Sequence, residues 1–266
     1  MSEKLRSSSI QRFTVGFFHF FKGFSYLGKH RLWGLARLAI GVNVLLFVLS
    51  LVGLWFWLYP ELNSWEQGLA TWGSDGWWRS ALARVLTWSM WVLAVVVCFG
   101  AGGALVLMGG QALASPILDK LSERVEMIEA MPVAPNMGMV RGTWMGLAVS
   151  FRDLFWGLAF LTVFHMPLFL LSFIPVLGVV VVPVISVGLT SLLFAHEFIG
   201  MIPARRFMGY RARWGVIRRH KWEGLGFGLA LVMVFFVPFL NLVLLPVAAV
   251  SGSLLFCDLQ KSTLVG

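Results

Sequence analysis

The chain has 266 residues, of which 59% are apolar or aromatic and only 12% are charged, and its mean hydropathy is +0.84. Soluble domains carry roughly 25% charged residues, so this composition leaves too little polar surface to cover a water-soluble body. It argues against a soluble enzyme, a disordered chain and a disulfide scaffold, and it predicts an integral membrane protein. Cys98 and Cys257 lie far apart in apolar stretches and are expected to be buried hydrophobic residues.

The N-terminal segment 1–37 is basic and contains an amphipathic stretch. Phenylalanines recur at helical spacing along one face of residues 12–27, while Arg12 and Lys22 lie off that face. No small-residue cleavage site follows, so a signal peptide is not expected. We predict an N-terminal amphipathic helix in the inner membrane interface, within a cytoplasmic or interfacial segment 1–37.

Two long transmembrane helices are predicted next, at 38–59 and 85–114. The first window has 22 residues without a charge, enough to cross about 30 Å of hydrocarbon. The second apolar window is longer, and the double glycine at 109–110 predicts its end or a bend. An outer loop at 60–84 separates the two helices. Segment 115–153 carries many charges, and Ser115 followed by Pro116 predicts the start of a cytoplasmic amphipathic helix that leads into a loop.

Two further apolar windows, 154–195 and 224–257, contain a repeated motif at an offset of 63 residues. Each copy has two prolines eight residues apart with Gly or Asn between them, which predicts the tip of a helical hairpin. The tip residues are Pro175, Gly178 and Pro183 in the first copy and Pro238, Asn241 and Pro246 in the second. The shorter arms, about 11–14 residues, span roughly 16–21 Å, which favours re-entrant hairpins over two ordinary membrane-crossing hairpins. Both alternatives stay open.

The net charge of +9 is concentrated in two segments. Residues 1–37 carry seven bases against Glu3, and the loop 196–223 carries seven bases against Glu197 and Glu223. The positive-inside rule places both segments in the cytoplasm and the loop 60–84 outside, which returns the tail 258–266 to the cytoplasm. These bases have three explanations at this stage: they only set the topology, they attract anionic lipids, or they attract an anionic solute.

Patterns for catalysis are missing from the sequence. There is no phosphate-binding loop, no metalloprotease motif, no nucleophile elbow and no cluster of His and Cys with metal-ligand spacing. We therefore expect no enzyme, no catalytic residue, no metal and no cofactor, and no nucleic-acid partner. His165 and Asn43 are polar residues inside apolar windows, and each is expected either to join helices or to contact a solute.

A family resemblance rests on several segments in a fixed order. They are the aromatic stretch 16–23, Asn43, segments 112–116 and 121–126, the two motifs at 173–175 and 236–241, and segment 254–258. With these segments the chain resembles the CysZ sulfate permease family of bacterial inner membranes, which shares a fold with a eukaryotic ER-membrane group. The resemblance implies two long transmembrane helices, partly penetrating hairpins, oligomeric assembly and ATP-independent sulfate uptake.

One departure from the family pattern concerns the substrate. Sulfate-handling members resemble one another in an Arg-Arg pair before the first span, and Trp33 and Gly34 stand at those positions here. Arg31 and Arg37 flank them, and guanidinium groups suit tetrahedral oxyanions. The anion-binding candidates are therefore Arg31, Arg37 and Asn43. The predicted protein is a passive inner-membrane permease or channel for sulfate or a similar oxyanion, a homo-oligomer with anionic lipids at its cytoplasmic face. The alternative is a non-transporting membrane scaffold or lipid-interacting protein of the same fold.

Overall fold

The computed structural model describes residues 8–74, 76–105, 111–131, 139–174, 177–237 and 240–264. Within these ranges every regular element is a helix, so the all-α prediction is confirmed. Four helical segments are long and apolar enough to cross a membrane: 33–73, 77–102, 177–199 and 243–262. The chain divides into two compact units, residues 38–116 and residues 1–37 with 117–266.

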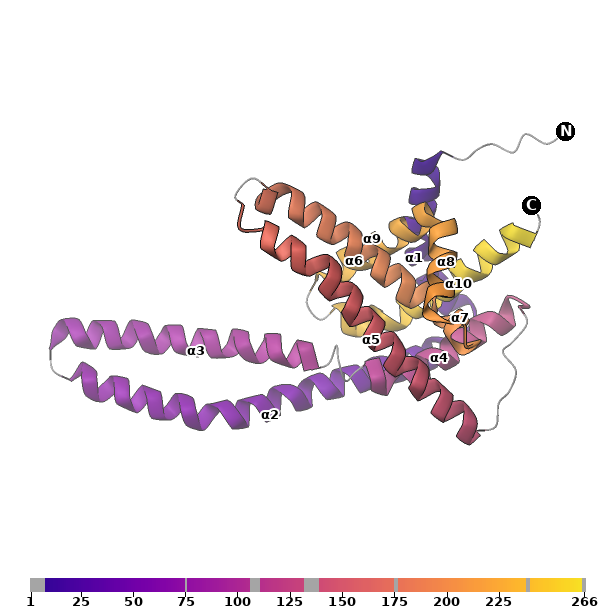
Figure 1. Ribbon diagram of the computed structural model, residues 1–266. Helices are drawn as coiled ribbons and strands as arrows, with labels where there is room; N and C mark the ends of the chain where they lie inside the picture. Colours follow the sequence, from indigo (N-terminus) through magenta and orange to yellow (C-terminus); the bar gives the residue numbers. More distant parts are fainter. Residues whose placement is uncertain are drawn as a thin grey trace. The chain divides into compact units, whose positions relative to one another are not determined.

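The unit of residues 38–116 is a long helical hairpin (Figure 1). Helix α2 (Trp33–Gly73), which begins in the other unit, continues into it and lies beside α3 (Trp77–Leu105). At 1.5 Å per residue the 41 residues of α2 extend about 60 Å, twice the thickness of a hydrocarbon core. Trp55, Tyr59 and Trp91 stack with ring centroids 5.8–6.2 Å apart, and Trp91 Nε1 donates a hydrogen bond to Glu66 Oε2 at 3.1 Å.

The boundaries of this hairpin differ from the sequence prediction. Instead of a loop over 60–84, α2 continues through Pro60 to Gly73, and α3 starts only four residues later. The next helix, α4 (Gln111–Ile128), begins before Ser115, so Pro116 lies inside it rather than at its first position. Polar residues interrupted the apolar windows, but they did not interrupt the helices.

The other unit contains the remaining helices. They are α1 (Ser9–Lys29), the C-terminal part of α4, α5 (Met139–Leu171), the π-helical turn η2 (Leu177–Val181), α6 (Val182–Ile199), α7 (Met201–Arg205), α8 (Tyr210–Arg219), α9 (Lys221–Phe235) and α10 (Leu240–Leu264). Helix α9 packs against α1 and α6, and α10 also contacts both. These contacts form the main core of the unit.

Helix α1 is capped by Ser8, which shares a capping box with Gln11. Its buried residues recur every three or four positions: Gly16, His19, Phe20, Gly23 and Leu27. This face packs on α9 and α10, so a helix lies where one was predicted and one of its faces is covered by protein, while its place in the membrane interface stays a prediction. Phe18 and Phe21 remain exposed on another side.

Glycines on α9 allow unusually close helix contacts. A Cβ atom at Gly228 would lie 1.7 Å from the Ser191 carbonyl oxygen of α6, and one at Gly226 would lie 2.1 Å from the Phe13 carbonyl oxygen of α1. Only hydrogen fits at these distances, so the backbones of three helices meet at α9. The small-residue pattern of this helix therefore marks a packing surface.

Two hairpins follow the predicted order, α5 with α6 and α9 with α10, and each pair is in contact. Pro183 lies in the first turn of α6 and Pro246 lies inside α10. Gly178 lies in η2, where a Cβ would be 2.2 Å from the Ser172 carbonyl oxygen. Pro175 and Pro238 lie outside the described residues, as does the side chain of Asn241.

The outgoing arms of both hairpins are longer than predicted. The helical segment 177–199 has 23 residues, about 35 Å, and α10 has 25. The prediction counted each arm from its second proline, but Pro183 is accepted in the first turn of α6, and α10 begins at Leu240 and continues through Pro246. The outgoing arms are therefore too long to favour re-entrant hairpins. Among the described helices of the two hairpins, α9 is short, with 15 residues.

Candidate functional site

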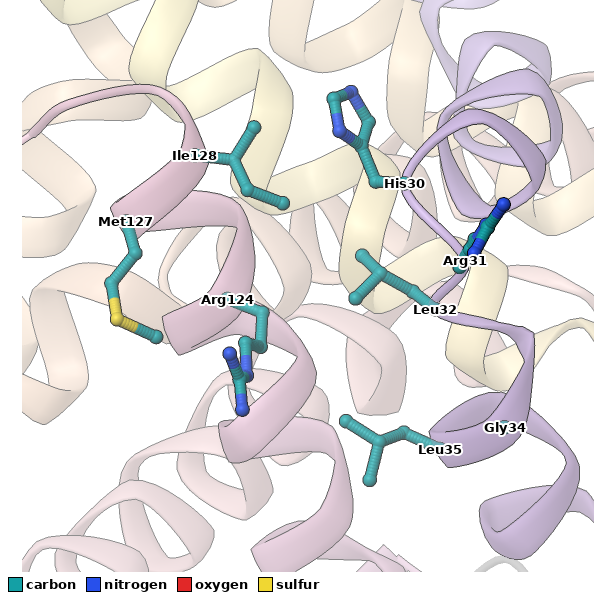
Figure 2. A pocket seen from close by; sticks show the side chains of 8 residues that line it. All are labelled: His30, Arg31, Leu32, Gly34, Leu35, Arg124, Met127 and Ile128. Carbon is teal, nitrogen blue, oxygen red and sulfur yellow. The ribbon is translucent and has the colours of Figure 1, made fainter.

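A pocket of about 570 Å³ lies between the turn that joins α1 to α2 and the C-terminal half of α4. Its lining residues are His30, Arg31, Leu32, Gly34, Leu35, Arg124, Met127 and Ile128, all in the same unit (Figure 2). Leu32 and Leu35 point toward α4, whereas the exposed Arg31 side chain is turned away from α4 (Figure 2). The walls are thus partly apolar, with cationic side chains at the edge.

The α1–α2 turn owes its shape to the end of α1. The Arg31 backbone is in the left-handed region, with φ of 55°. The amides of Arg31 and Leu32 donate to the carbonyl oxygens of Gly28 and Leu27 at 3.3 and 3.0 Å, which closes α1. Helix α2 then starts at Trp33, and the first N–H groups of a helix have no acceptor within it. Since Gly34 has open space around its Cα, the positive end of the α2 dipole is accessible from the pocket.

The structure separates the three predicted anion-binding residues. Arg31 lines the pocket, but Arg37 and Asn43 do not. Arg37 is exposed on α2, while Asn43 is only 2% exposed and belongs to the other unit. Asn43 lies on the buried stripe of α2, in register with Ala39 and Phe47, and Arg37 lies on a different face.

Arg124 is the pocket residue that the sequence reasoning missed. It comes from α4, more than ninety residues after Arg31, and is surrounded along the helix by Glu123 and Glu126. This mixed charge made α4 resemble an ordinary solvated helix. The sequence feature that could have identified Arg124 is its position in segment 121–126, one of the segments that carry the family resemblance.

The opposite side of α4 carries a buried charge cluster. The Glu126 side chain is fully buried and accepts hydrogen bonds from Arg205 Nη2 at 2.6 Å and from Arg206 Nε at 3.0 Å. Arg205 also donates to Ser122 Oγ at 3.3 Å, and Ser253 donates to the same oxygen at 2.8 Å. The cluster joins α4 to α7 and α10, so two bases of the predicted cationic loop share one internal carboxylate.

A second carboxylate fastens α4 to α1 and α10. Glu129 accepts hydrogen bonds from the Tyr26 hydroxyl at 3.0 Å and from Lys261 Nζ at 2.6 Å. Burial alone would raise the pKa of Glu129, but these two hydrogen bonds outweigh it and hold the pKa below its ordinary value. Burial and the same hydrogen bond raise the pKa of Tyr26. Contacts on one side of α4 therefore hold the helix in place, and a different side of the helix lines the pocket.

His165 lies apart from both clusters. Its Nε2 atom is 3.4 Å from Thr190 Oγ1, which joins α5 to α6. Of the two roles expected for this histidine, the contact supports the one that joins helices.

The model of one protein family, described as sulfate transporter CysZ/etoposide-induced protein 2.4, matches residues 19–246. The chain belongs to this family. A relative, the sulfate transporter CysZ of Pectobacterium atrosepticum, is 26% identical over 256 residues, which cover 96% of this chain and 89% of the relative. Family membership confirms the resemblance seen in the sequence and the expectation that the chain is not an enzyme. Together with the four apolar helices it identifies a multi-pass membrane protein.

Proposed function

We propose that this protein is a passive, ATP-independent permease for sulfate or a similar small oxyanion in the bacterial inner membrane. The observation that carries the proposal is the pocket at the α1–α2 turn, which is lined by Arg31, Arg124 and the start of α2. Similarity to a relative named as a sulfate transporter supports the same substrate class.

The pocket offers a dianion two kinds of favourable group. Guanidinium groups form paired, charge-assisted hydrogen bonds with tetrahedral oxyanions, and the N–H groups at a helix start add donors and a positive dipole end. Because Arg31 is exposed, its side chain has room to rotate. In this proposal anion binding draws Arg31 toward the pocket, where it and Arg124 replace the Arg-Arg pair of other family members. Arg37 and Asn43 act elsewhere, Arg37 as an exposed anchor and Asn43 between helices or along the anion path.

For the topology we propose that both termini and the segment 196–223 are cytoplasmic and that the α2–α3 turn is outside. The distribution of bases supports this orientation. The excess length of α2 supports a hairpin that extends beyond the hydrocarbon, with Glu61 and Glu66 in the extension. Single cysteines at Ser74 and Gly215 should react with an impermeant thiol reagent from opposite sides of the membrane. Labelling of both from one side contradicts the orientation.

Uptake of radiolabelled sulfate into proteoliposomes tests the function. Under a sulfate gradient without ATP, wild-type vesicles should accumulate sulfate well above empty vesicles. Arg31→Gln/Arg124→Gln should reduce the initial rate at least about tenfold, because it removes both charge-assisted contacts. Lys120→Gln, an exposed cation elsewhere on α4, serves as the matched control and should keep the wild-type rate.

Three outcomes separate the proposal from its alternative. Uptake equal to empty vesicles removes transport and favours the membrane scaffold or lipid-interacting protein. Uptake that requires ATP removes the passive mechanism. Uptake that is unchanged in the double variant keeps transport but removes this pocket from it. Light scattering of the purified protein gives the oligomer size, for which we propose a homo-oligomer.

A further inference from the structure

The seven bases between Arg205 and Lys221 form one continuous cationic segment in the sequence, but the structure divides them into two groups. Arg205 and Arg206 bind the buried Glu126 carboxylate, and Arg213 is only 5% exposed, with its guanidinium 5.7 Å from the Tyr210 ring. The other four are exposed: Arg211, Arg218, Arg219 and Lys221. In the described part of the chain no ion pair with a carboxylate is recorded for these four.

Helix α8 has two distinct faces. Arg213 and Ile217, one turn apart, form its buried face, and a Cβ at Gly224 would lie 3.5 Å from Ile217 Cγ2. Ile217 therefore packs close to Gly224, and α8 lies against α9 through this buried face. Arg211 and Arg218 are seven residues apart and so share one side of the helix, with Arg219 next to them. We call Arg211, Arg218, Arg219 and Lys221 the α8 basic patch.

The α8 basic patch lies where two packed apolar helices end. The segment 177–199 ends at Ile199, α9 starts at Lys221, and α6 and α9 pack along each other. Ile199 is 1% exposed, whereas Val184 and Phe236, at the far end of the pair, are 70% and 86% exposed. If the exposed apolar end lies in hydrocarbon, as large apolar side chains require, the patch lies at the membrane surface.

Tryptophans accompany the cations, as expected at a membrane interface. The Arg211 guanidinium is 6.0 Å from the ring of Trp156, which is 39% exposed, and Lys221 Nζ is 5.4 Å from the Trp222 ring. Trp214 stacks on Phe160 and on His196 and fixes α8 against α5 and α6. Indole rings prefer the headgroup region, and a cation over a ring face keeps its N–H groups free for an outer acceptor.

We infer that the α8 basic patch binds the phosphodiester headgroups of anionic phospholipids. Lipid is favoured over a free oxyanion because the cations are exposed on α8 and at the start of α9 rather than in either described pocket, and because tryptophans lie beside two of them. The inference is separate from the anion pocket, whose lining includes no residue of the patch.

The test is native mass spectrometry of the purified full-length protein titrated with phosphatidylglycerol or with phosphatidylcholine of the same acyl chains. Wild type should bind phosphatidylglycerol at least about tenfold more tightly, since each base near an anionic surface contributes on the order of fivefold. Arg211→Gln/Arg218→Gln/Arg219→Gln should reduce this preference to within about twofold. The same three positions changed to Lys should keep it, because the charge remains.

A charge-matched control decides whether position matters. Lys29→Gln/Arg84→Gln/Lys120→Gln removes three exposed cations outside the patch and should keep the wild-type preference. Phosphate added at the same ionic strength as chloride should leave the bound phosphatidylglycerol in place. An unchanged preference in the Gln variant overturns the inference, as does an equal loss in the control. Displacement by phosphate but not by chloride assigns the patch to free oxyanions and also overturns it. Size-exclusion profiles verify that each variant is folded.

Discussion

Helices α2 and α10 are both long and apolar, yet their surroundings are opposite. In the most apolar window of α2 only 17% of the residues are buried within the protein, compared with 83% in α10. Both windows are apolar enough to cross a membrane, although the α10 window is the less apolar of the two. They also differ in the size of their side chains. The buried part of α10 contains Ala248, Ala249 and Ser251, whereas α2 exposes Leu49, Phe56 and Trp57. Small residues allow helices to approach, while large apolar ones meet lipid, so size indicates whether an apolar helix faces protein or membrane.

The two units also differ in how they hold buried polar groups. Among the described residues of the hairpin α2–α3, Asn43 is the one polar side chain that is nearly fully buried. The other unit buries Glu126, His19 and His196, and the two arginines bound to Glu126 are partly buried. We therefore expect substitutions in that unit to affect the free energy of unfolding far more than matched substitutions in the hairpin.

The largest difference is expected between glycines of the two units. Gly228→Ala should prevent correct packing of α9 on α6, because its Cβ would lie 1.7 Å from a carbonyl oxygen. Gly53→Ala in α2 meets nothing within 4 Å and should be neutral or slightly stabilising, as alanine favours helix by up to about 1 kcal/mol. Fluorescence-detected size exclusion should show a folded peak only for Gly53→Ala. Two equal peaks contradict the close contact.

Loss of the buried carboxylate should have the next largest effect. Glu126→Gln leaves Arg205 and Arg206 without their charged acceptor, and breaking a buried ion pair costs about 3–5 kcal/mol. The matched change in the hairpin is Glu66→Gln, which removes the charge but leaves an amide oxygen that can accept from Trp91 Nε1, and it should cost at most about 1 kcal/mol. Thermal unfolding in detergent measures both, and similar midpoints for the two variants contradict this role of Glu126.

His19 should make the stability of its unit depend on pH. Burial, aided by the positive charge of Lys22, lowers the pKa of His19 to about 4 from an ordinary 6.5. Since the unfolded chain then binds the proton more readily, the stabilisation is complete above pH 6.5 and is lost as the pH falls toward 4. The loss amounts to about 3 kcal/mol at most, and Asp258, whose Oδ2 is 3.7 Å from His19 Nε2, opposes it.

His19→Gln tests this dependence because it does not titrate. Between pH 7 and 5 the melting temperature of wild type should fall more than that of the variant. His220, whose pKa is also lowered mainly by burial, contributes a part of the pH dependence of stability that remains in both proteins. Parallel curves for the two proteins rule out His19 as the cause.

The smallest effect is expected for the exposed ion pair between Lys261 and Glu129. Lys261→Ala removes the ion pair with Glu129, but the lysine side chain is 46% exposed, and such pairs contribute at most about 1 kcal/mol. Tyr26 continues to donate to Glu129 in this variant. Chemical denaturation should detect a small decrease in the free energy of unfolding. A decrease as large as that of Glu126→Gln contradicts the division between buried and exposed ion pairs.

The sequence predicted the helical class, the order of the spans and both hairpins, because apolar windows and repeated prolines depend on local properties. It misplaced the boundaries where local signals are ambiguous. The first span was predicted to end before Pro60, and Pro116 was predicted to start a helix, but both lie within helices, and the second proline of each hairpin lies inside the outgoing helix.

The pairing of distant charges was not predictable from the sequence. Arg205 and Arg206 appeared as part of a cationic loop, since Glu126 is 79 and 80 residues away from them along the chain. Arg31 was named as an anion-binding candidate, which stays a prediction, and no pattern in the sequence indicated that Arg124 of α4 lies beside the α1–α2 turn. Local patterns identify helices, whereas a site made from three segments depends on how those helices pack.

The contact of α1 with α9 and α10 has a consequence for biosynthesis. Helix α1 is the first of these helices to leave the ribosome, but its buried face is covered by the last two. Until α9 begins at residue 221, the buried face of α1 lacks both helices that cover it, and Glu126 lacks its arginines until residue 206. The polypeptide therefore has to hold an unfinished apolar helix at the membrane through most of translation, and truncation before α9 should leave this unit unassembled.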